Sequence, residues 1–524
     1  MGRTADSRAG ELTAEELAGA PHRSRQDGRD RLVTENAAAH GALREAALPD
    51  VLTGVTRGAF VARGGGAVLD VEDPATQSVV ARFEQTSQDG VADAVENAHG
   101  AWLGWSRLDP AERGRHLMRV AETLRAHADL LARLECIDSG KPISQARADI
   151  AGSARYFEYY AGLADKIHGE TIPQPAGTFT YTVREPYGVV AHITPWNAPL
   201  TQLTRGVAPC LACGNTVVVK PSELTPLTSV LAARLMVEAG LPPGVCNVVL
   251  GTGDETGTHL TSHPLVRHIT FTGSVAAGRR VGMVAAERIV GVNLELGGKS
   301  PSIVCADADL DVAAKAGALA VIRNSGQSCF ATTRLIVDRR VHDEFVEKLA
   351  AHVAGLSVGH GLDDPDVGPL ISARQRSRVL DYIGLATRDG AQVVVGGAAP
   401  DGVERGHFVA PTVLCGVTND MTVAREEIFG PVQSVIVFES LDEAIALAND
   451  TEYGLSAGVF TGHVGTAHRL AAALQAGQVQ VNRYTGAGVE VPFGGYKNSG
   501  LGREKGLEAL AHYTQLKSVI VATG

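Results

Sequence analysis

The sequence predicts an α/β fold in which helices cover parallel sheets, spread over two large domains and smaller pieces. At 524 residues the chain is too long for one ordinary core. From about residue 60, strand-like and helical segments alternate, as they do in repeated β-α-β units. The 60 glycines exceed average usage, which fits the tight turns that such units need.

The elements of the first series can be placed in order along the chain. Helices are expected at 91–105, 111–139, 225–240 and 275–289, and strands at 215–219, 245–250 and 268–271. A second series runs from Ser302 to about Phe460. We find no internal repeat of solenoid period. The pattern therefore favours two successive α/β units.

Composition excludes several classes of protein. The net charge of −11 and the lack of a basic stripe argue against a nucleic-acid partner. No apolar run reaches the length of a membrane span, and the N-terminus has no signal or transit pattern, so we expect a cytoplasmic protein without a membrane partner. The seven cysteines, an odd and scattered set, indicate a reducing compartment. Cys210 and Cys213 form a C-x-x-C, but no second pair sits at zinc-ligand spacing, so we expect packing and no metal.

Residues 1–55 differ from the rest of the chain. They are rich in Ala, Arg, Asp and Glu, with weak helical patterning between Leu12 and Leu17. This composition is typical of a solvated extension that is flexible or partly helical. An oligomerisation arm is the alternative interpretation.

Two glycine-containing turns are candidates for binding a nucleotide. Gly251, Gly253 and Gly257 follow a strand, one residue longer in spacing than the usual dinucleotide fingerprint, and ordinary turn chemistry explains them equally well. Phe271-Thr-Gly-Ser274 lies where a strand ends and a helix begins, so backbone N–H groups and the Ser274 hydroxyl could meet a phosphate. Together they suggest a nucleotide at the carboxyl ends of parallel strands.

Lys220 and Glu223 follow the earlier strand, which is expected at 215–219. Charged residues at such a strand end are often part of a solvated loop. If a nucleotide binds, both are placed to meet the adenosine ribose hydroxyls, and the carboxylate of Glu223 would repel a 2′-phosphate.

Three residues are candidates for covalent chemistry, each with a structural alternative. Cys329 has small and polar neighbours in Gly-Gln-Ser-Cys, although a lone Cys is usually a core residue. Glu295 ends an apolar stretch beside two glycines, where burial would raise its pKa toward that of a general base. Asn197 lies between two prolines and could serve a turn or donate its amide to an oxyanion.

From about residue 60 to its end, the chain resembles the aldehyde dehydrogenase superfamily. Glu295 and Cys329 are 34 residues apart, as is usual in the family. The matching motifs, in the family's order, are Thr194-Pro-Trp-Asn197, Gly214-Asn-Thr-Val-Val-Val-Lys-Pro221, Phe271-Thr-Gly-Ser274, Glu295-Leu-Gly-Gly-Lys-Ser300, Gly326-Gln-Ser-Cys329, Glu426-Glu-Ile-Phe-Gly-Pro431 and Pro492-Phe-Gly-Gly-Tyr-Lys497.

The resemblance implies how the chain is divided. A Rossmann-like dinucleotide-binding domain would take 56–167 and 187–297, and an α/β catalytic domain 298–498. A small β oligomerisation element would take 168–186 and 499–524, combining a hairpin around 178–186 with a terminal strand near 516–521. A homodimer or homotetramer is expected.

The resemblance also implies a mechanism and a cofactor, NAD. Cys329 would attack the aldehyde, Asn197 and the Cys329 backbone N–H would hold the oxyanion, and Glu295 would activate the water that hydrolyses the thioester. The cofactor-binding residues would be Ile193, Thr194, Trp196, Lys220, Glu223, Gly253, Gly257, Phe271, Gly273, Ser274, Leu296, Gln375, Glu427 and Phe429.

Four residues depart from the family's usual pattern at the expected substrate channel. Ala198 stands where an aromatic is common, and Arg205 with Gly206 replaces a Trp-Lys pair. Ala198, Thr201, Gln202 and Arg205 would share one helix face and are smaller or more polar than an aromatic lining. They suggest a bulky or polar aldehyde. Arg205 would bind a substrate carboxylate or hydroxyls, or else pair with a protein carboxylate such as Glu490.

Two other functions remain as alternatives. A CoA-acylating dehydrogenase would pass the acyl group to a thiol, but such enzymes commonly lack the residue matched by Glu295. A non-catalytic binding protein of the same fold would be favoured by loss of Cys329 or Glu295, and both are present.

Overall fold

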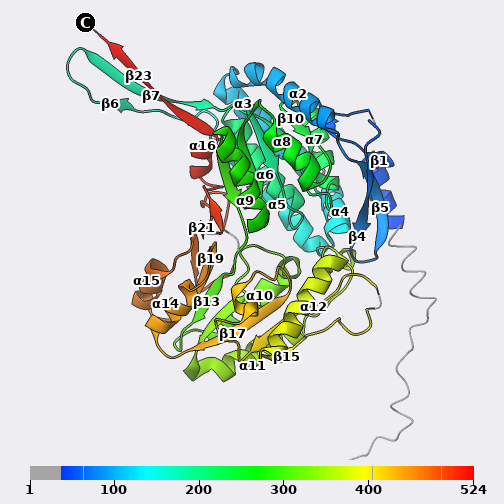
Figure 1. The fold of residues 1–524 in the computed structure, drawn as a ribbon, viewed down its shortest axis with the longest axis vertical. Helices are drawn as coiled ribbons and strands as arrows, with labels where there is room; N and C mark the ends of the chain where they lie inside the picture. The colour runs from blue at the N-terminus through cyan, green and yellow to red at the C-terminus, as the bar shows by residue number, and fades with distance from the viewer. Residues whose placement is uncertain (1–36, 63, 404, 485–486, 524) are drawn as a thin grey trace, which may run out of the picture.

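The computed structural model describes residues 37–62, 64–403, 405–484 and 487–523. Two α/β bodies lie one above the other, and a β ribbon projects from the upper body (Figure 1). The upper body comes mainly from the first 300 residues and the lower from the next 180. The alternating pattern of the sequence therefore folds as two separate sheets covered by helices.

An eight-stranded sheet forms the centre of the upper body, in the order β22-β12-β11-β8-β9-β10-β2-β3. Its five central strands are parallel, and β8, the first of them in the chain, lies between β9 and β11, so the strand order reverses there. The strands are β2 Val55–Thr56, β3 Ala59–Phe60, β8 Val189–Ile193, β9 Thr216–Lys220, β10 Cys246–Val248, β11 Val266–Thr272, β12 Gly291–Glu295 and β22 Gly500–Leu501. This is a doubly wound sheet, in which ligands bind at the carboxyl ends of the strands where the order reverses.

Helices cover both faces of this sheet. They are α2 Gln88–Ser106, α3 Pro110–Ala126, α4 Ala128–Ser139, α5 Ile143–Ala161, α6 Pro199–Ala212, α7 Leu227–Glu238, α8 Thr258–Ser262 and α9 Val275–Arg288, with the short turn η2 Gly253–Gly257. The single helix expected at 111–139 is wrong, because α3 ends at His127, whose φ of −105° interrupts the helix. No Gly or Pro marks that break, so the periodicity alone runs through it.

Residues 37–55 belong to the upper body, so the expected extension to residue 55 is too long. Residues 37–45 are helical, and Ala39, Ala42 and Ala46 are buried in the main core cluster. β1 (Val51–Leu52) then joins a three-stranded sheet with β4 (Val68–Asp73) and β5 (Ser78–Glu84). Small alanines allow the helix to pack closely, and the polar composition hides this. The expected helical pattern at Leu12–Leu17 lies outside the described residues.

The lower body has a seven-stranded sheet in the order β15-β16-β17-β14-β13-β19-β20, parallel except for β15. The strands are β13 Pro301–Val304, β14 Arg334–Asp338, β15 Gln392–Val395, β16 Thr412–Cys415, β17 Val432–Phe438, β19 Ser456–Phe460 and β20 Gln478–Val481. Its helices are α10 Leu310–Ile322, α11 His342–Ala354, α12 Ala373–Arg388, α13 Thr422–Arg425, α14 Leu441–Asn449 and α15 Val464–Ala473, with the short turns η3 Arg323–Gly326, η4 Arg339–Val341 and η5 Gly361–Asp363.

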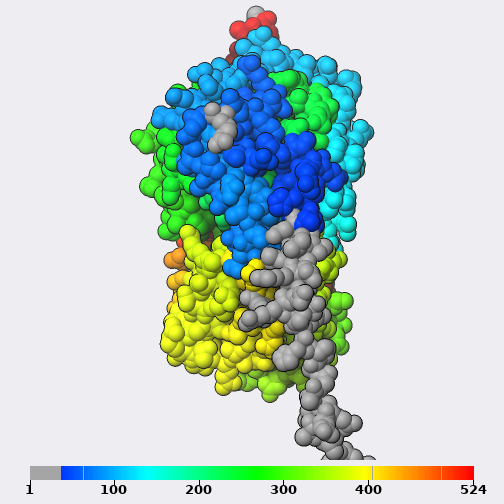
Figure 2. Space-filling model, turned by 90° about the vertical axis from the view of Figure 1, so that its right-hand side faces the viewer, coloured from blue at the N-terminus to red at the C-terminus, as the bar shows by residue number. Residues whose placement is uncertain are grey.

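The two bodies are in direct contact. In Figure 2 the early residues, in blue, lie against the yellow residues of the lower body. The His407 backbone N–H donates to the Pro74 carbonyl at 3.0 Å, and His407 Nε2 lies 2.6 Å from Glu72 Oε1. A Cβ on Gly140 would lie 2.5 Å from Pro369. These contacts hold the lower sheet against the carboxyl edge of the upper one.

The ribbon pairs the expected segments. β7 (Thr178–Pro186) lies between β6 (Thr171–Ile172) and the terminal strand β23 (Thr514–Ala522), all antiparallel. β22 instead pairs with β12 in the eight-stranded sheet, and α16 (Glu508–His512) packs on α6. A short pair, β18 (Tyr453–Gly454) with β21 (Tyr496–Lys497), lies between the bodies. The oligomerisation element expected from residue 499 onward therefore includes β22, which belongs to the eight-stranded sheet and not to the ribbon.

Candidate active site

Cys329 lies on a tightly held loop between α10 and β14. Three successive residues before it, Asn324, Ser325 and Gly326, have φ angles of 47°, 57° and 72°. A Cβ on Gly326 would lie 2.2 Å from the Gly430 carbonyl oxygen, so only glycine fits. Two non-glycine residues in left-handed backbone are a sign of strain stored at a functional position. The loop is fixed by Ser325 Oγ, which donates to the Gly368 carbonyl at 2.8 Å.

Asn197 contacts this loop directly. It follows β8 and precedes α6, at the carboxyl end of the central strand. Its Nδ2 donates to the Gln327 carbonyl at 3.0 Å, and its own carbonyl accepts from Asn324 Nδ2 at 2.7 Å. The side-chain amide carries two N–H groups, so one remains for a ligand atom beside Cys329.

Glu295 ends β12 and is 2% exposed. Neither carboxyl oxygen has a hydrogen-bond partner among the described residues. Burial raises the pKa of Glu295 well above its usual range, and the nearby charge of Glu504 adds to this. Burial therefore makes this carboxyl a stronger base than an exposed one, as a general base requires.

The thiol of Cys329 is also held in its neutral form. Removal from water raises its pKa to about 12, while the cation of Arg205 opposes the rise. The negative charges of Glu427 and Glu295 raise it further. The thiol is therefore protonated at rest and gains reactivity from positive charge placed near it.

A cavity of about 510 Å³ opens over Cys329 and Asn197. The four residues expected on one face of α6, namely Ala198, Thr201, Gln202 and Arg205, all line it. Sequence analysis missed its aromatic and charged lining from other elements: Tyr156, Phe330, Tyr484, Phe493, Asp149, Arg323 and Lys505. The expectation of a lining poor in aromatics is therefore wrong. Only Phe330, next to the nucleophile, carried a local signal.

Arg205 forms a buried ion pair with Glu504. The alternative that Arg205 meets a protein carboxylate holds, but the expected partner Glu490 is wrong. Glu490 instead accepts from Arg155 at 2.7 Å on the surface. Phe493 and Glu504 exchange backbone hydrogen bonds of 2.6 and 2.7 Å. This pairing holds Glu504 in place beside Arg205 of α6. A contact between residues so distant in sequence leaves no local pattern.

The residues expected at the adenosine end of a nucleotide lie together at the ends of β8 and β9. Lys220 Nζ donates to the Pro221 carbonyl at 2.8 Å and lies 3.6 Å from Glu223 Oε2. A Cβ on Gly257 would lie 3.6 Å from Lys220 Cδ and 3.9 Å from Ile193 Cδ1. Burial lowers the pKa of Lys220. These side chains therefore converge at one edge of the sheet.

Two expected positions leave room for a phosphate. No atom lies within 4 Å of a Cβ built on Gly253. Ser274 caps α9, since its Oγ accepts from the Ala277 backbone N–H at 3.3 Å, which leaves the hydroxyl hydrogen free to donate. The sequence-predicted cluster of glycine and hydroxyl at a helix start is thus present.

The strands beside them are closely packed. The Thr194 backbone N–H donates to the Lys220 carbonyl at 3.1 Å, and that of Gly273 to the Glu295 carbonyl at 3.0 Å. Phe271 and Leu296 are buried, and a Cβ on Gly273 would lie 2.7 Å from the Phe271 ring. Their part in the site is to shape the backbone between β11 and β12.

The lower body contributes Glu427 and Phe429. Glu427 Oε1 accepts from the Gly298 backbone N–H at 3.0 Å, and burial raises its pKa to about 7. The Phe429 ring meets Trp196 edge to face at 5.2 Å. Gln375 donates to the Phe429 carbonyl at 2.8 Å, so it holds this loop. The lower body thus reaches the loop that follows β12, through the contact of Glu427 with Gly298.

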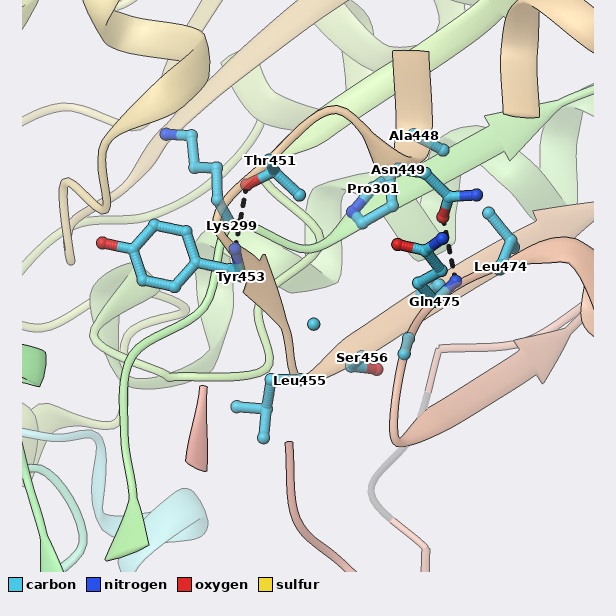
Figure 3. A pocket seen from close by; sticks show the side chains of 13 residues that line it. Lys299, Pro301, Ala448, Asn449, Thr451, Tyr453, Leu455, Ser456, Leu474 and Gln475 are labelled. Atoms are coloured by element: carbon cyan, nitrogen blue, oxygen red, sulfur yellow. Dashed lines mark hydrogen bonds between the residues drawn. The ribbon is translucent and has the colours of Figure 1, made fainter. Parts of the chain in front are cut away.

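A second, small cavity of about 10 Å³ lies behind the loop that follows β12. Figure 3 shows Thr451 and Asn449 hydrogen-bonded to the backbone of Tyr453 and Gln475 around it, with the amino group of Lys299 pointing away. It has room for about one water molecule. It belongs to the packing of the lower body.

The described ranges contain no group of three or more His, Cys, Asp or Glu side chains placed to hold a metal ion. Within the same ranges, no helix has the length and apolar character needed to cross a membrane. Cys210 and Cys213 are free and buried, as expected for packing residues.

The doubly wound sheet and the cavity that holds Cys329 and Asn197, with the buried Glu295 nearby, are features of a nucleotide-dependent dehydrogenase. Residues 60–519 match the model of the aldehyde dehydrogenase family. The chain belongs to this family.

Several relatives are similar over nearly their whole length. A betaine aldehyde dehydrogenase of Mesorhizobium japonicum is 45% identical over 471 residues, which cover 89% of this chain and 96% of that protein. The NAD⁺ complex of an aldehyde dehydrogenase from Bacillus cereus has a TM-score of 0.90 at 40% identity, covering 92% and 98% of the two chains. A betaine aldehyde dehydrogenase of Staphylococcus aureus in complex with NAD⁺ has a TM-score of 0.90 at 36% identity, covering 94% and 98%.

Proposed function

We propose that this enzyme oxidises an aldehyde to its carboxylic acid, with NAD as the electron acceptor. The observation that carries the proposal is the cavity that has Cys329 and Asn197 in its wall, together with the buried carboxyl of Glu295, which is close enough for its charge to raise the pKa of Cys329. Each of these groups has the chemistry that one step requires. The two halves of the reaction would share a single site.

In the first half, Cys329 gives up its thiol proton to solvent and its sulfur adds to the aldehyde carbon, so that the carbonyl oxygen becomes an oxyanion. The free amide N–H of Asn197 and the Cys329 backbone N–H stabilise that oxyanion. NAD, when bound, would supply the acceptor for the hydride that leaves the same carbon with its two electrons. The carbonyl then re-forms, and the acyl group remains on Cys329 as a thioester.

In the second half, Glu295 takes a proton from water as the oxygen attacks the thioester. The C–S bond breaks, the acid leaves and Cys329 is released. The raised pKa of Glu295 suits a base that must hold this proton near neutral pH. The presence of Glu295 favours hydrolysis of the thioester over transfer of the acyl group to CoA, because transfer to a thiol needs no base that activates water.

The residues at the carboxyl edge of the upper sheet fit NAD. Lys220 and Glu223 would meet the adenosine ribose, the open position at Gly253 and the start of α9 the phosphates, and Glu427 the nicotinamide ribose. The solved relatives that were crystallised with NAD⁺ support this assignment. The carboxylate of Glu223 argues for NAD rather than NADP.

We further propose a bulky or polar substrate, and an assembly of two or four copies in the cytoplasm. A cavity of about 510 Å³ is large for acetaldehyde. The projecting ribbon exposes Phe179, Leu516 and Ile520, with 48%, 59% and 73% of their surface accessible, which suits contact with another copy. Seven free cysteines suit a reducing compartment.

Two variants test the mechanism. Cys329→Ala should abolish NADH formation by several orders of magnitude while NAD binding, followed by fluorescence titration, survives. Glu295→Gln should give a burst of NADH, a slow steady state and an acyl adduct on Cys329 in the mass spectrum. Substantial turnover by Cys329→Ala, or the absence of both burst and adduct in Glu295→Gln, would contradict the assigned roles.

A further inference from the structure

The charged side chains in the wall of the aldehyde cavity are three cations and one carboxylate: Arg205, Arg323, Lys505 and Asp149. Two of the cations have protein partners. Arg205 pairs with Glu504, and Arg323 lies 3.8 Å from Asp149, which also accepts from the buried Lys141 at 2.7 Å. The one carboxylate of this wall, Asp149, is therefore already engaged.

Lys505 is the cation that remains. Its amino group donates to the Ala487 carbonyl at 2.7 Å, and no ion pair joins it to a carboxylate in the described part of the chain. The residue is 6% exposed and has a left-handed φ of 63°. An ammonium group has three N–H donors, and a buried one is stable only with hydrogen-bonded or charged partners. Lys505 thus presents unused donors to the cavity.

Two aromatic rings of the cavity, those of Phe493 and Phe330, are already faced by cations of the protein. Arg205 Cζ lies 5.1 Å and Lys505 Nζ 5.7 Å from the centre of the Phe493 ring. Arg323 Cζ lies 5.5 Å from the centre of the Phe330 ring. A quaternary ammonium group is bound by the open faces of such rings. Here a cation of the protein already lies over Phe493 and over Phe330, and the three positive charges in the wall would repel a second cation.

We propose that Lys505 is a specificity-determining residue that binds a carboxylate at the end of the substrate away from the aldehyde, with Arg323 adding to the attraction. The substrate class is then an aldehyde that carries a carboxylate, such as an ω-carboxy aldehyde, rather than the trimethylammonium aldehyde named for two of the relatives. This inference rests on the proposed function, because it assigns the substrate of the same cavity.

The test compares matched substrates. 4-Oxobutanoate, 5-oxopentanoate and 6-oxohexanoate are assayed against their methyl esters and against betaine aldehyde, with NADH formation as the measurement. At least one acid should exceed its ester by about tenfold or more in kcat/KM, which corresponds to about 1.4 kcal/mol. Betaine aldehyde should be a poorer substrate than either.

Variants of Lys505 locate the preference. Lys505→Met keeps the length of the side chain, so it should remove the preference for acids by raising the KM of the acids more than that of the esters. Lys505→Arg should keep the preference, and Lys505→Glu should raise kcat/KM for betaine aldehyde. Lys315→Met, on an exposed lysine of α10, is the matched control and should change nothing.

Three results would overturn the inference: equal kcat/KM for every acid and its ester, a wild-type preference for betaine aldehyde, or an acid preference that survives in Lys505→Met. If that variant does not fold, the wild-type substrate comparison decides alone. Failure of the proposed function looks different, because then no aldehyde of any charge gives NADH.

Discussion

The cofactor side and the aldehyde side of Cys329 differ in how their residues are distributed along the chain. On the cofactor side, the groups of the upper body lie at strand ends or helix starts, as Lys220 ends β9 and Ser274 caps α9, and a loop of the lower body adds Glu427 and Phe429. On the aldehyde side, the wall is assembled from α5, α6, α10, the Cys329 loop and the segment 484–505. The first uses backbone geometry that one β-α unit supplies, and the second depends on packing between the two bodies.

The two sides also differ in electrostatics. At the cofactor side, Lys220 and the partly exposed Glu223 leave charge accessible to a ligand. At the aldehyde side, the Arg205–Glu504 pair is almost fully buried and acts on Cys329 and Glu295 through space. Because of this contrast, we expect substitutions on the two sides to have different effects. Changes on the cofactor side should alter which cofactor is used, and changes on the aldehyde side should alter stability and substrate.

The largest effect is expected from breaking the buried pair. Arg205→Leu leaves the Glu504 carboxylate buried without its partner, which should cost about 3–5 kcal/mol of folding free energy and lower the Tm by several degrees. Thermal unfolding measures the loss. The double variant with Glu504→Gln should recover most of it.

A matched control is available on the surface. Arg155→Leu removes the exposed ion pair with Glu490, in which about half of each side chain is accessible, so the loss should be about 1 kcal/mol or less. Similar losses at the buried and the exposed pair would contradict the importance given to burial.

An intermediate effect is expected at Glu223. Repulsion between its carboxylate and a 2′-phosphate at about 4 Å is worth roughly 1–4 kcal/mol, so NAD should be preferred over NADP by several-fold to hundreds-fold. Glu223→Ser should narrow this ratio without changing the order of preferred aldehydes. Equal kcat/KM for both cofactors in the wild type would defeat the prediction.

The smallest effect is a pH dependence at Lys505. Burial and the charge of Arg205 lower the pKa of Lys505 to about 8, while Glu490 and Glu504 oppose this and Arg323 adds to it. The lysine is charged below that pH and neutral above it. The preference for a carboxylate aldehyde over its ester should therefore be complete near pH 7 and fall by about tenfold above pH 9.

The ester provides the internal control, because both substrates react with the same thiol and the same base. The ratio of the two kcat/KM values cancels the titration of Cys329 and Glu295. A ratio that stays constant from pH 7 to pH 9.5 would count against Lys505 as the group that meets the carboxylate.

The sequence by itself determined the α/β class and the family, and it predicted the nucleophile and the cofactor-side residues. These are properties of short segments: β-branched runs, helix starts and motifs such as Glu295-Leu-Gly-Gly, in which local geometry requires particular residues. The helix face of Ala198, Thr201, Gln202 and Arg205 was equally readable, since helical spacing fixes it.

Only the tertiary structure decided what those residues meet. Glu504, rather than Glu490, reaches Arg205 because its backbone pairs with that of Phe493. Lys505 and Arg323 face the cavity because the two bodies close over α6. Such contacts join residues far apart in the chain, and their energies come from burial and charge that exist only after folding. No local pattern encodes them, so the charge of the aldehyde pocket had to be taken from the structure.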